Sequence, residues 1–120
     1  MRILIVDDSK AMRLIVMRAL RQAGYGDHTL VEAIDGAEAL AMIQTTLPDL
    51  VLSDWNMPKM SGIDLLRSVN ANGIKLKFGF VTSEGTAEMR QLAIESGALF
   101  VITKPFTPET FRETLGALAA

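Results

Sequence analysis

Residues Ile3 to Ser9 read ILIVDDS, so four apolar residues run directly into two adjacent carboxylates, Asp7 and Asp8. An unbroken apolar run of this length is typical of a strand in a parallel sheet, because such strands are covered on both faces and lose the apolar and polar alternation. The pattern returns at residues 50–54, where LVLS precedes Asp54. The two runs predict two central strands whose carboxyl ends both carry acidic residues.

Segments with helical periodicity separate the short apolar runs. After the first run, apolar residues spaced three and four apart predict an amphipathic helix with a buried face, made of Met12, Ile15, Val16, Ala19, Leu20 and Ala23. Arg13, Arg18 and Arg21 fall on the opposite face, so we expect them to be exposed. Ser9 is expected to cap the start of this helix, and Gly24 to close its end.

Further strands are expected at 28–33, 78–82 and 99–103, and further helices after Asp35, after Gly62, near Ala87 and from the Thr107-Pro108 cap onward. Five strands alternating with five helices predict an α/β fold with a doubly wound parallel sheet, because parallel strands need crossovers and right-handed crossovers cover both faces. The apolar first, third and fifth strands should be buried on both sides. No linker or repeat interrupts the series, so we expect one domain over residues 1–120.

Composition excludes several classes of protein. The chain has 120 residues, of which 49% are hydrophobic and 22% charged, and a formal net charge of -2. This charge and the absence of a lysine or arginine run argue against a direct nucleic-acid partner. The absence of cysteine excludes disulfides and thiolate metal sites. No apolar run approaches the roughly 20 residues of a membrane span, and none resembles a signal-peptide core, so we expect a cytoplasmic protein without membrane insertion.

Polar residues gather where the predicted strands end, which is where open parallel sheets bind ligands; they are Asp7, Asp8, Asp54, Thr82 and Lys104. If the first and third strands are neighbours, three carboxylates converge. Two unit charges ~4 Å apart cost about 4 kcal/mol at an effective dielectric of ~20, so such a cluster needs a cation, raised pKa values, or both. Oxygen ligands without histidine or cysteine favour a hard cation such as Mg²⁺.

A cation at this position would suit phosphoryl transfer to a carboxylate, with an acyl phosphate as the product. Thr82 could then donate a hydrogen bond to a phosphoryl oxygen, and Lys104 could supply a fixed positive charge. Each residue taken alone has a simpler explanation, as a solvated acid at a helix start, a strand-end hydroxyl or a surface ammonium. Because all of these residues follow the ends of predicted strands, a shared site for a cation and a phosphoryl group is the favoured interpretation.

Four stretches in order, VDDS at 6–9, SDWNMPKMSG at 53–62, VTSE at 81–84 and TKPF at 103–106, resemble the receiver domain of two-component response regulators. The size of the chain is similar to that of single-domain chemotaxis receivers. The resemblance implies a flavodoxin-like (βα)5 fold with strand order 2-1-3-4-5. It further implies that a histidine kinase phosphorylates Asp54.

The resemblance also assigns roles within the site. It implies that Asp7, Asp8, Asp54 and the backbone carbonyl of Asn56 arrange Mg²⁺, that Thr82 and Lys104 bind the phosphoryl group, and that the Lys104-Pro105 bond is cis. Asn56 and Glu84 occupy positions that modulate acyl-phosphate hydrolysis in the family, and their identities imply a short-lived signal.

One position departs from the family pattern. Val101 lies where receivers with an aromatic switch carry tyrosine or phenylalanine, three residues before Lys104. Phe100 should lie on the opposite face, because side chains alternate along a strand. The output surface is therefore expected to respond through the backbone and the helix near Ala87 rather than through a moving ring.

We interpret the chain as a stand-alone receiver, not an enzyme beyond its own phosphorylation and dephosphorylation, with no output domain within 1–120. It would signal by phosphorylation-dependent binding to a separate downstream protein, with chemotaxis as one candidate pathway. Its oligomeric state stays open between a monomer and a weak phosphorylation-dependent dimer. The alternative is a receiver-like binding module with a silent phosphorylation site. An aspartyl phosphohydrolase would need an acid at Asn56, and a flavodoxin-like cofactor binder would need a phosphate loop in place of Asp7-Asp8-Ser9.

Overall fold

The computed structural model describes residues 1–119 and shows a five-stranded parallel sheet in the order β2-β1-β3-β4-β5. The strands are β1 (Arg2–Val6), β2 (Thr29–Ala33), β3 (Leu50–Ser53), β4 (Lys77–Thr82) and β5 (Phe100–Thr103). The helices are α1 (Lys10–Leu20), α2 (Gly36–Thr46), α3 (Gly62–Ala71), α4 (Ala87–Glu95) and α5 (Pro108–Ala119). The predicted doubly wound architecture and strand order are therefore confirmed.

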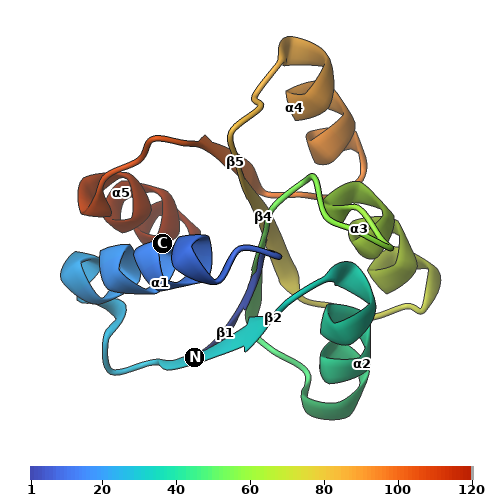
Figure 1. Cartoon of the computed structure of the whole chain (residues 1–120), viewed down its shortest axis with the longest axis horizontal. Helices are drawn as coiled ribbons and strands as arrows, with labels where there is room; N and C mark the ends of the chain where they lie inside the picture. The colour runs from blue at the N-terminus through green and yellow to red at the C-terminus, as the bar shows by residue number, and fades with distance from the viewer. Residues whose placement is uncertain (120) are drawn as a thin grey trace.

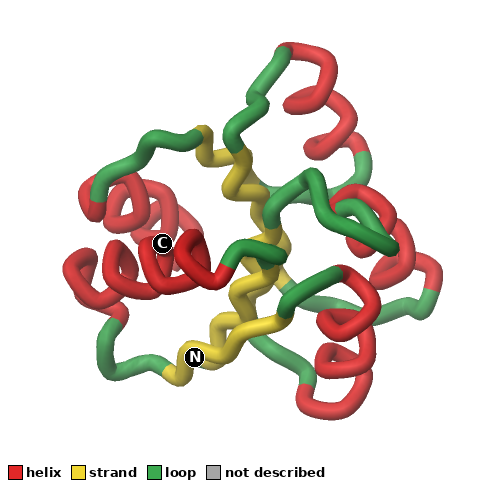
Figure 2. The backbone as a smooth tube through the Cα atoms, in the orientation of Figure 1, coloured by secondary structure: helices red, strands yellow, loops and turns green. Residues whose placement is uncertain are grey.

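The helices cover both faces of the sheet. In Figure 1, α1 and α5 lie on one side, and α2, α3 and α4 lie on the other. Figure 2 shows the strands as one twisted row through the middle of the molecule, with helices on both sides. Each crossover therefore returns the chain to the amino edge of the sheet, where the next strand starts. The carboxyl ends of all five strands lie together at the opposite edge, because every neighbouring pair is parallel.

The core forms two clusters, one on each side of the sheet. Alternate side chains of β1 enter opposite clusters, as the pleat requires: Leu4 and Val6 pack beneath α2 to α4, whereas Ile3 and Ile5 pack beneath α1 and α5. All four are at most 1% exposed, and full burial of such a side chain contributes about 1.5–3 kcal/mol. Strands β1 and β3 are thus covered on both faces, as predicted.

The same prediction holds only in part for β5, whose side chains contact the core on both faces of the sheet without being fully buried. This strand lies at the edge of the sheet, and Ile102 is its one buried residue. An edge strand has a neighbour on one side only, so its side chains are less completely covered than those of a central strand. An apolar run cannot by itself distinguish the two positions.

The prediction for α1 is correct for its capping and wrong for two side chains. Ser9 Oγ accepts from the Met12 N–H at 3.2 Å, as expected for the cap. However, Ile15 is 50% exposed and Arg13 only 8% exposed. The helix is rotated so that Arg13 reaches Glu32 and the carbonyl of Asp7, and these partners offset the cost of burying its charge.

The other helices start at side-chain caps near the carboxyl edge. Asp35, Ser61 and Thr86 accept from backbone N–H groups in the first turns of α2, α3 and α4. Thr107 Oγ1 accepts from the Thr110 N–H at 3.4 Å, which confirms the predicted start of α5. After α1, a π-helical turn (Arg21–Tyr25) contains Gly24 at φ 104°, the left-handed closure that was predicted. Among residues 1–119, no helix has the length and apolar character needed to cross a membrane.

Candidate metal centre at the carboxyl edge of the sheet

Neighbouring strands bring three carboxylates together. β1 and β3 pair with Val6 opposite Ser53, and the Asp54 N–H donates to the carbonyl of Val6 at 2.9 Å. Asp7, Asp8 and Asp54 therefore follow the strands at the same level. One carboxylate oxygen from each lies within 4.8 Å of the other two.

Asp7 is the most firmly held of the three acids. It is 4% exposed, and its N–H donates to the carbonyl of Ala33 in β2 at 3.2 Å. Its Oδ1 accepts from the Ser9 N–H at 2.9 Å, and its carbonyl accepts from Arg13 at 2.7 Å. Asp8, by contrast, is exposed, so the cluster opens toward solvent on its side.

Lys104 reaches the acids from the far end of the chain. Its Nζ lies 3.3 Å from Oδ2 of Asp7 and 3.9 Å from Oδ1 of Asp54, and its side chain is 17% exposed. The residue follows β5 and precedes a cis peptide bond to Pro105, as the resemblance implied. The ammonium offsets part of the repulsion between the two buried carboxylates.

The pKa of Asp54 is raised above the ordinary value for an aspartate. Burial is the largest cause, because it disfavours the charged form. Asp7 and Asp8 raise the pKa further by repulsion, whereas Lys104 and the Trp55 N–H, which donates to Asp54 Oδ1 at 2.7 Å, lower it. A bound cation would act in the same direction as Lys104.

The donor set fits a magnesium ion. All candidate ligands are oxygens, and a site with few carboxylates and an open side matches the preference of Mg²⁺ for keeping part of its water shell. His28, the single histidine, lies elsewhere and contacts the terminal amine of Met1 through Nδ1 at 2.8 Å. The acidic cluster therefore has no histidine or cysteine ligand.

The loops after β3 and β4 meet beside Asp54. Thr82 is 1% exposed at the end of β4, and its Oγ1 accepts from the Glu84 N–H at 3.2 Å. Asn56 Nδ2 donates to Oε1 of Glu84 at 3.1 Å. The structure thus places in direct contact the two residues expected to modulate hydrolysis. The ring of Trp55 packs on Phe80 with centroids 4.8 Å apart.

Two residues that shape the site were missed by sequence reasoning. Arg13 was expected on the solvent face of its helix, and nothing in the local pattern shows its distant partner Glu32. Gly62 closes the stretch at 53–62 and precedes a predicted helix, but neither feature predicts its contact with Asp54. A Cβ at Gly62 would lie 2.2 Å from the carbonyl oxygen of Asp54 and 2.8 Å from the ring of Phe80. A glycine in the first turn of a helix, where most residues are better helix formers, is its one sequence signal.

Val101 and Phe100 point to opposite faces of the sheet, as expected. Val101 packs against the cluster beneath α2 to α4, and Phe100 against the cluster beneath α1 and α5. The side chain that bridges this region is Arg90 of α4. Its guanidinium donates to the carbonyls of Gly85 at 3.2 Å and Val101 at 3.3 Å, which ties the β4–α4 loop to the edge of β5.

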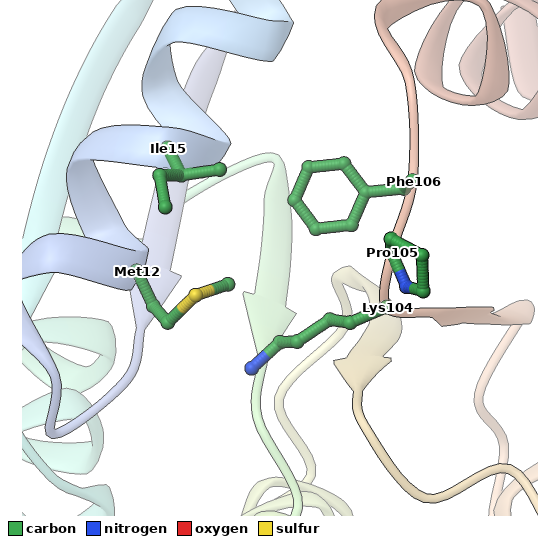
Figure 3. A pocket seen from close by; sticks show the side chains of 5 residues that line it. All are labelled: Met12, Ile15, Lys104, Pro105 and Phe106. Atoms are coloured by element: carbon green, nitrogen blue, oxygen red, sulfur yellow. The ribbon is translucent and has the colours of Figure 1, made fainter.

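An apolar groove of about 390 Å³ lies beside the acidic cluster, and Lys104 lines it. Figure 3 shows Met12 and Ile15 of α1 facing Pro105 and Phe106 across it, with Lys104 on the same side as the latter two. The exposed Ile15, which the helical pattern had placed in the core, is therefore one wall of a surface groove.

Comparisons with known proteins agree with this geometry. The profile of the response regulator receiver domain matches residues 3–116. The chain is 43% identical to the chemotaxis protein CheY-3 of Vibrio cholerae over 96% of this chain and 88% of that protein. It is 40% identical to the chemotaxis protein CheY of Pseudomonas aeruginosa over 96% and 93% of the two chains.

Solved structures show the same fold. The structure of Vibrio cholerae CheY4 superposes with a TM-score of 0.84 at 36% identity, covering 97% of this chain and 96% of that one. The receiver domain of NarL from Mycobacterium tuberculosis superposes with a TM-score of 0.87 at 28% identity, covering 98% and 94%. On the family match, the sequence identities and the fold together, the chain belongs to the response regulator receiver family.

Proposed function

We propose that this receiver accepts a phosphoryl group on Asp54 from a histidine kinase and signals by binding a separate protein while phosphorylated. The observation that carries the proposal is the cluster of Asp7, Asp8 and Asp54 with the ammonium of Lys104 beside it. If the three acids had only a structural role, their mutual repulsion would destabilise the fold with nothing to offset it. In a site that binds a cation, their negative charge instead attracts the cation, which can then bind a phosphoryl group.

The transfer forms a bond between a carboxylate oxygen of Asp54 and phosphorus, while the bond from phosphorus to the imidazole nitrogen of the donor breaks. The electron pair of that bond stays on the imidazole, which takes a proton from solvent. Mg²⁺, held by Asp7, Asp8, Asp54 and the backbone carbonyl of Asn56, would supply charge neutralisation at the phosphoryl oxygens. Lys104 contributes a second positive charge, and the Thr82 hydroxyl donates to a phosphoryl oxygen.

The lifetime of the signal depends on access of water to the acyl phosphate. Asn56 and Glu84 lie at the mouth of the site and hydrogen bond to each other at 3.1 Å. Both side chains are polar and exposed, so they leave a hydrated approach to Asp54 rather than an apolar cover. This arrangement supports rapid loss of the phosphoryl group, as the resemblance implied.

A protein donor is supported by the groove beside the site. Met12, Ile15 and Phe106 give it an apolar lining, and an exposed apolar groove of this kind is typical of protein contacts. The relatives at 43% and 40% identity are chemotaxis proteins, which makes chemotaxis the pathway to test first. The alternative is a binding module that never becomes phosphorylated.

The test follows Trp55 fluorescence during titration with Mg²⁺ and then with acetyl phosphate, alongside intact-protein mass measurement. We expect a saturable response to Mg²⁺, followed by a mass gain of one phosphoryl group. Asp54→Asn should abolish the mass gain. Asp27→Asn, which changes an exposed acid elsewhere, should leave both signals unchanged. A wild-type protein that binds Mg²⁺ but gains no mass, even with candidate kinases, would favour the silent binding module.

A further inference from the structure

Arg13 is a buried charge at a position where the helical pattern predicted solvent. Its side chain is 10% exposed, and it makes two short contacts. The Nε lies 2.9 Å from Oε1 of Glu32, and an NH group donates to the carbonyl of Asp7 at 2.7 Å. Burying a guanidinium is costly unless both its charge and its donors are satisfied. Here one partner lies on β2 and the other belongs to the acidic cluster.

The carbonyl that Arg13 binds belongs to the peptide group joining Asp7 to Asp8. Because this group is planar, its carbonyl oxygen can turn only if ψ of Asp7 and φ of Asp8 change together. Both of those residues carry carboxylates of the cluster. These two torsions set how the Cα–Cβ bonds of Asp7 and Asp8 are directed relative to each other, so holding the carbonyl oxygen restrains that direction.

Glu32 and its strand complete the support. The Nε of Arg13 donates to Glu32, which leaves the NH groups of the same guanidinium directed at the carbonyl of Asp7. The next residue of β2, Ala33, accepts the Asp7 N–H through its carbonyl at 3.2 Å. Strand β2 thus holds Asp7 directly through its backbone and indirectly through Arg13.

We propose that Arg13 is a positioning residue of the metal centre. It holds the Asp7-Asp8 peptide so that both carboxylates face a common point, and Glu32 orients it. The inference rests on the proposed function, because it assumes that the cluster binds Mg²⁺. Arg13 acts on the cluster through the backbone of Asp7 and is not itself a ligand.

Whether Mg²⁺ affinity falls or rises on removal of Arg13 distinguishes a positioning role from a purely electrostatic one. Removing Arg13 deletes a positive charge near three acids and leaves Glu32 unpaired, and both changes strengthen the attraction of the site for a cation. Loss of positioning weakens binding instead. Weaker Mg²⁺ binding after the loss of a nearby positive charge therefore has to come from geometry.

The experiment measures Mg²⁺ affinity by Trp55 fluorescence in wild type, Arg13→Met and the double variant Arg13→Met with Glu32→Gln. Methionine keeps the apolar stem and removes every donor, and the double variant removes both charges together. We expect about a tenfold loss of affinity in Arg13→Met and in the double variant, the scale typical for residues that support metal ligands. Arg18→Met, on the exposed side of the same helix, is the matched control and should stay within about twofold of wild type.

Thermal unfolding of each variant without Mg²⁺ identifies the temperature at which all are folded, and the titrations are done there. Unchanged or tighter binding in folded Arg13→Met would overturn the positioning role. Equal weakening in Arg18→Met would also overturn it, because the effect would then belong to helix charge in general. If wild type itself shows no Mg²⁺ response, the proposed function fails, which is a different result from the failure of Arg13 alone.

Discussion

The ammonium of Lys104 lies 3.3 Å from Oδ2 of Asp7, although 97 positions separate the two residues in the chain. The same nitrogen lies 3.9 Å from Oδ1 of Asp54. One side chain from the end of β5 therefore links the acids that follow β1 and β3. The positive charge that offsets the acids after β1 and β3 thus comes from a residue that only the complete sheet brings into contact with them.

Lys104→Met should destabilise the metal-free protein. The substitution leaves the buried carboxylate of Asp7 and the half-buried carboxylate of Asp54 without their counter-charge, and removing one partner of a buried polar contact costs about 1–3 kcal/mol. Mg²⁺ should reverse most of this loss, because a cation in the cluster restores the charge balance and stabilises the folded state by binding it. Urea unfolding with and without Mg²⁺ measures both effects. Lys75→Met, at an exposed site, is the control, and a loss that Mg²⁺ does not reduce would contradict the account.

Asp54→Asn should raise stability at neutral pH and have less effect in acid. The pKa of Asp54 is raised in the folded state, so this group favours folding below its unfolded pKa of about 3.9. That contribution is lost as pH rises through the higher folded pKa. Asparagine does not ionise and avoids the loss. Urea unfolding midpoints are measured from pH 4 to pH 8 in the presence of a chelator. The midpoint of the variant should exceed that of wild type near pH 8, and the difference should shrink toward pH 4.

The opposite trend would mean that the ion pair with Lys104 outweighs the burial of Asp54. In that case wild type would lead at neutral pH, and the lead would shrink in acid. Asp27→Asn again serves as the control, because Asp27 is exposed and lies away from the cluster.

Sequence reasoning predicted the elements of this fold because apolar periodicity reports local burial. The runs ending at Asp7 and Asp54 define two central strands, and parallel pairing then brings their ends together. Periodicity does not, however, set the rotation of a helix against its neighbours. Ile15 and Arg13 exchange their expected places because the partners of Arg13 come from β2 and from the turn after β1. Such partners are invisible to a local pattern.

The incomplete burial of β5 and the tight approach at Gly62 do not follow from the local apolar pattern, for a related reason. Whether a strand has one neighbour or two depends on sheet order, which the apolar run at 99–103 does not carry. The missing side chain of Gly62 matters only because the backbone of Asp54 passes beside it. Both features depend on tertiary structure, and both concern parts of the chain near the candidate site.

Lys59→Asn should stabilise the protein. Lys59 has φ 69°, a left-handed conformation that costs a residue with an ordinary side chain about 1–2 kcal/mol, and asparagine tolerates it better. The substitution gives up an ion pair to Asp35 at 3.8 Å, but the lysine side chain is 74% exposed, and such pairs contribute little. We expect a gain of up to about 1 kcal/mol in urea unfolding. Lys75→Asn, at an exposed lysine without positive φ, should give no gain, and equal gains at both sites would rule out the backbone explanation.

Gly62→Ala should damage both stability and phosphorylation. A Cβ would fall 2.2 Å from the carbonyl oxygen of Asp54, so the backbone of this proposed phosphoacceptor has to shift. Overpacking of this kind costs about 1–3 kcal/mol. Gly116→Ala is the matched control, since among the described atoms none lies within 4 Å of its added Cβ and alanine is the better helix former by up to about 1 kcal/mol.

The Gly62 and Gly116 variants therefore should move in opposite directions in urea unfolding. Phosphorylation by acetyl phosphate, measured at saturating Mg²⁺ on folded protein, should slow in Gly62→Ala alone, because only that substitution displaces Asp54. Normal phosphorylation in a destabilised Gly62→Ala would show that the strain is absorbed by Phe80 or the α3 start rather than by Asp54. The close approach at Gly62 would then serve packing and not the placement of the proposed phosphoacceptor Asp54.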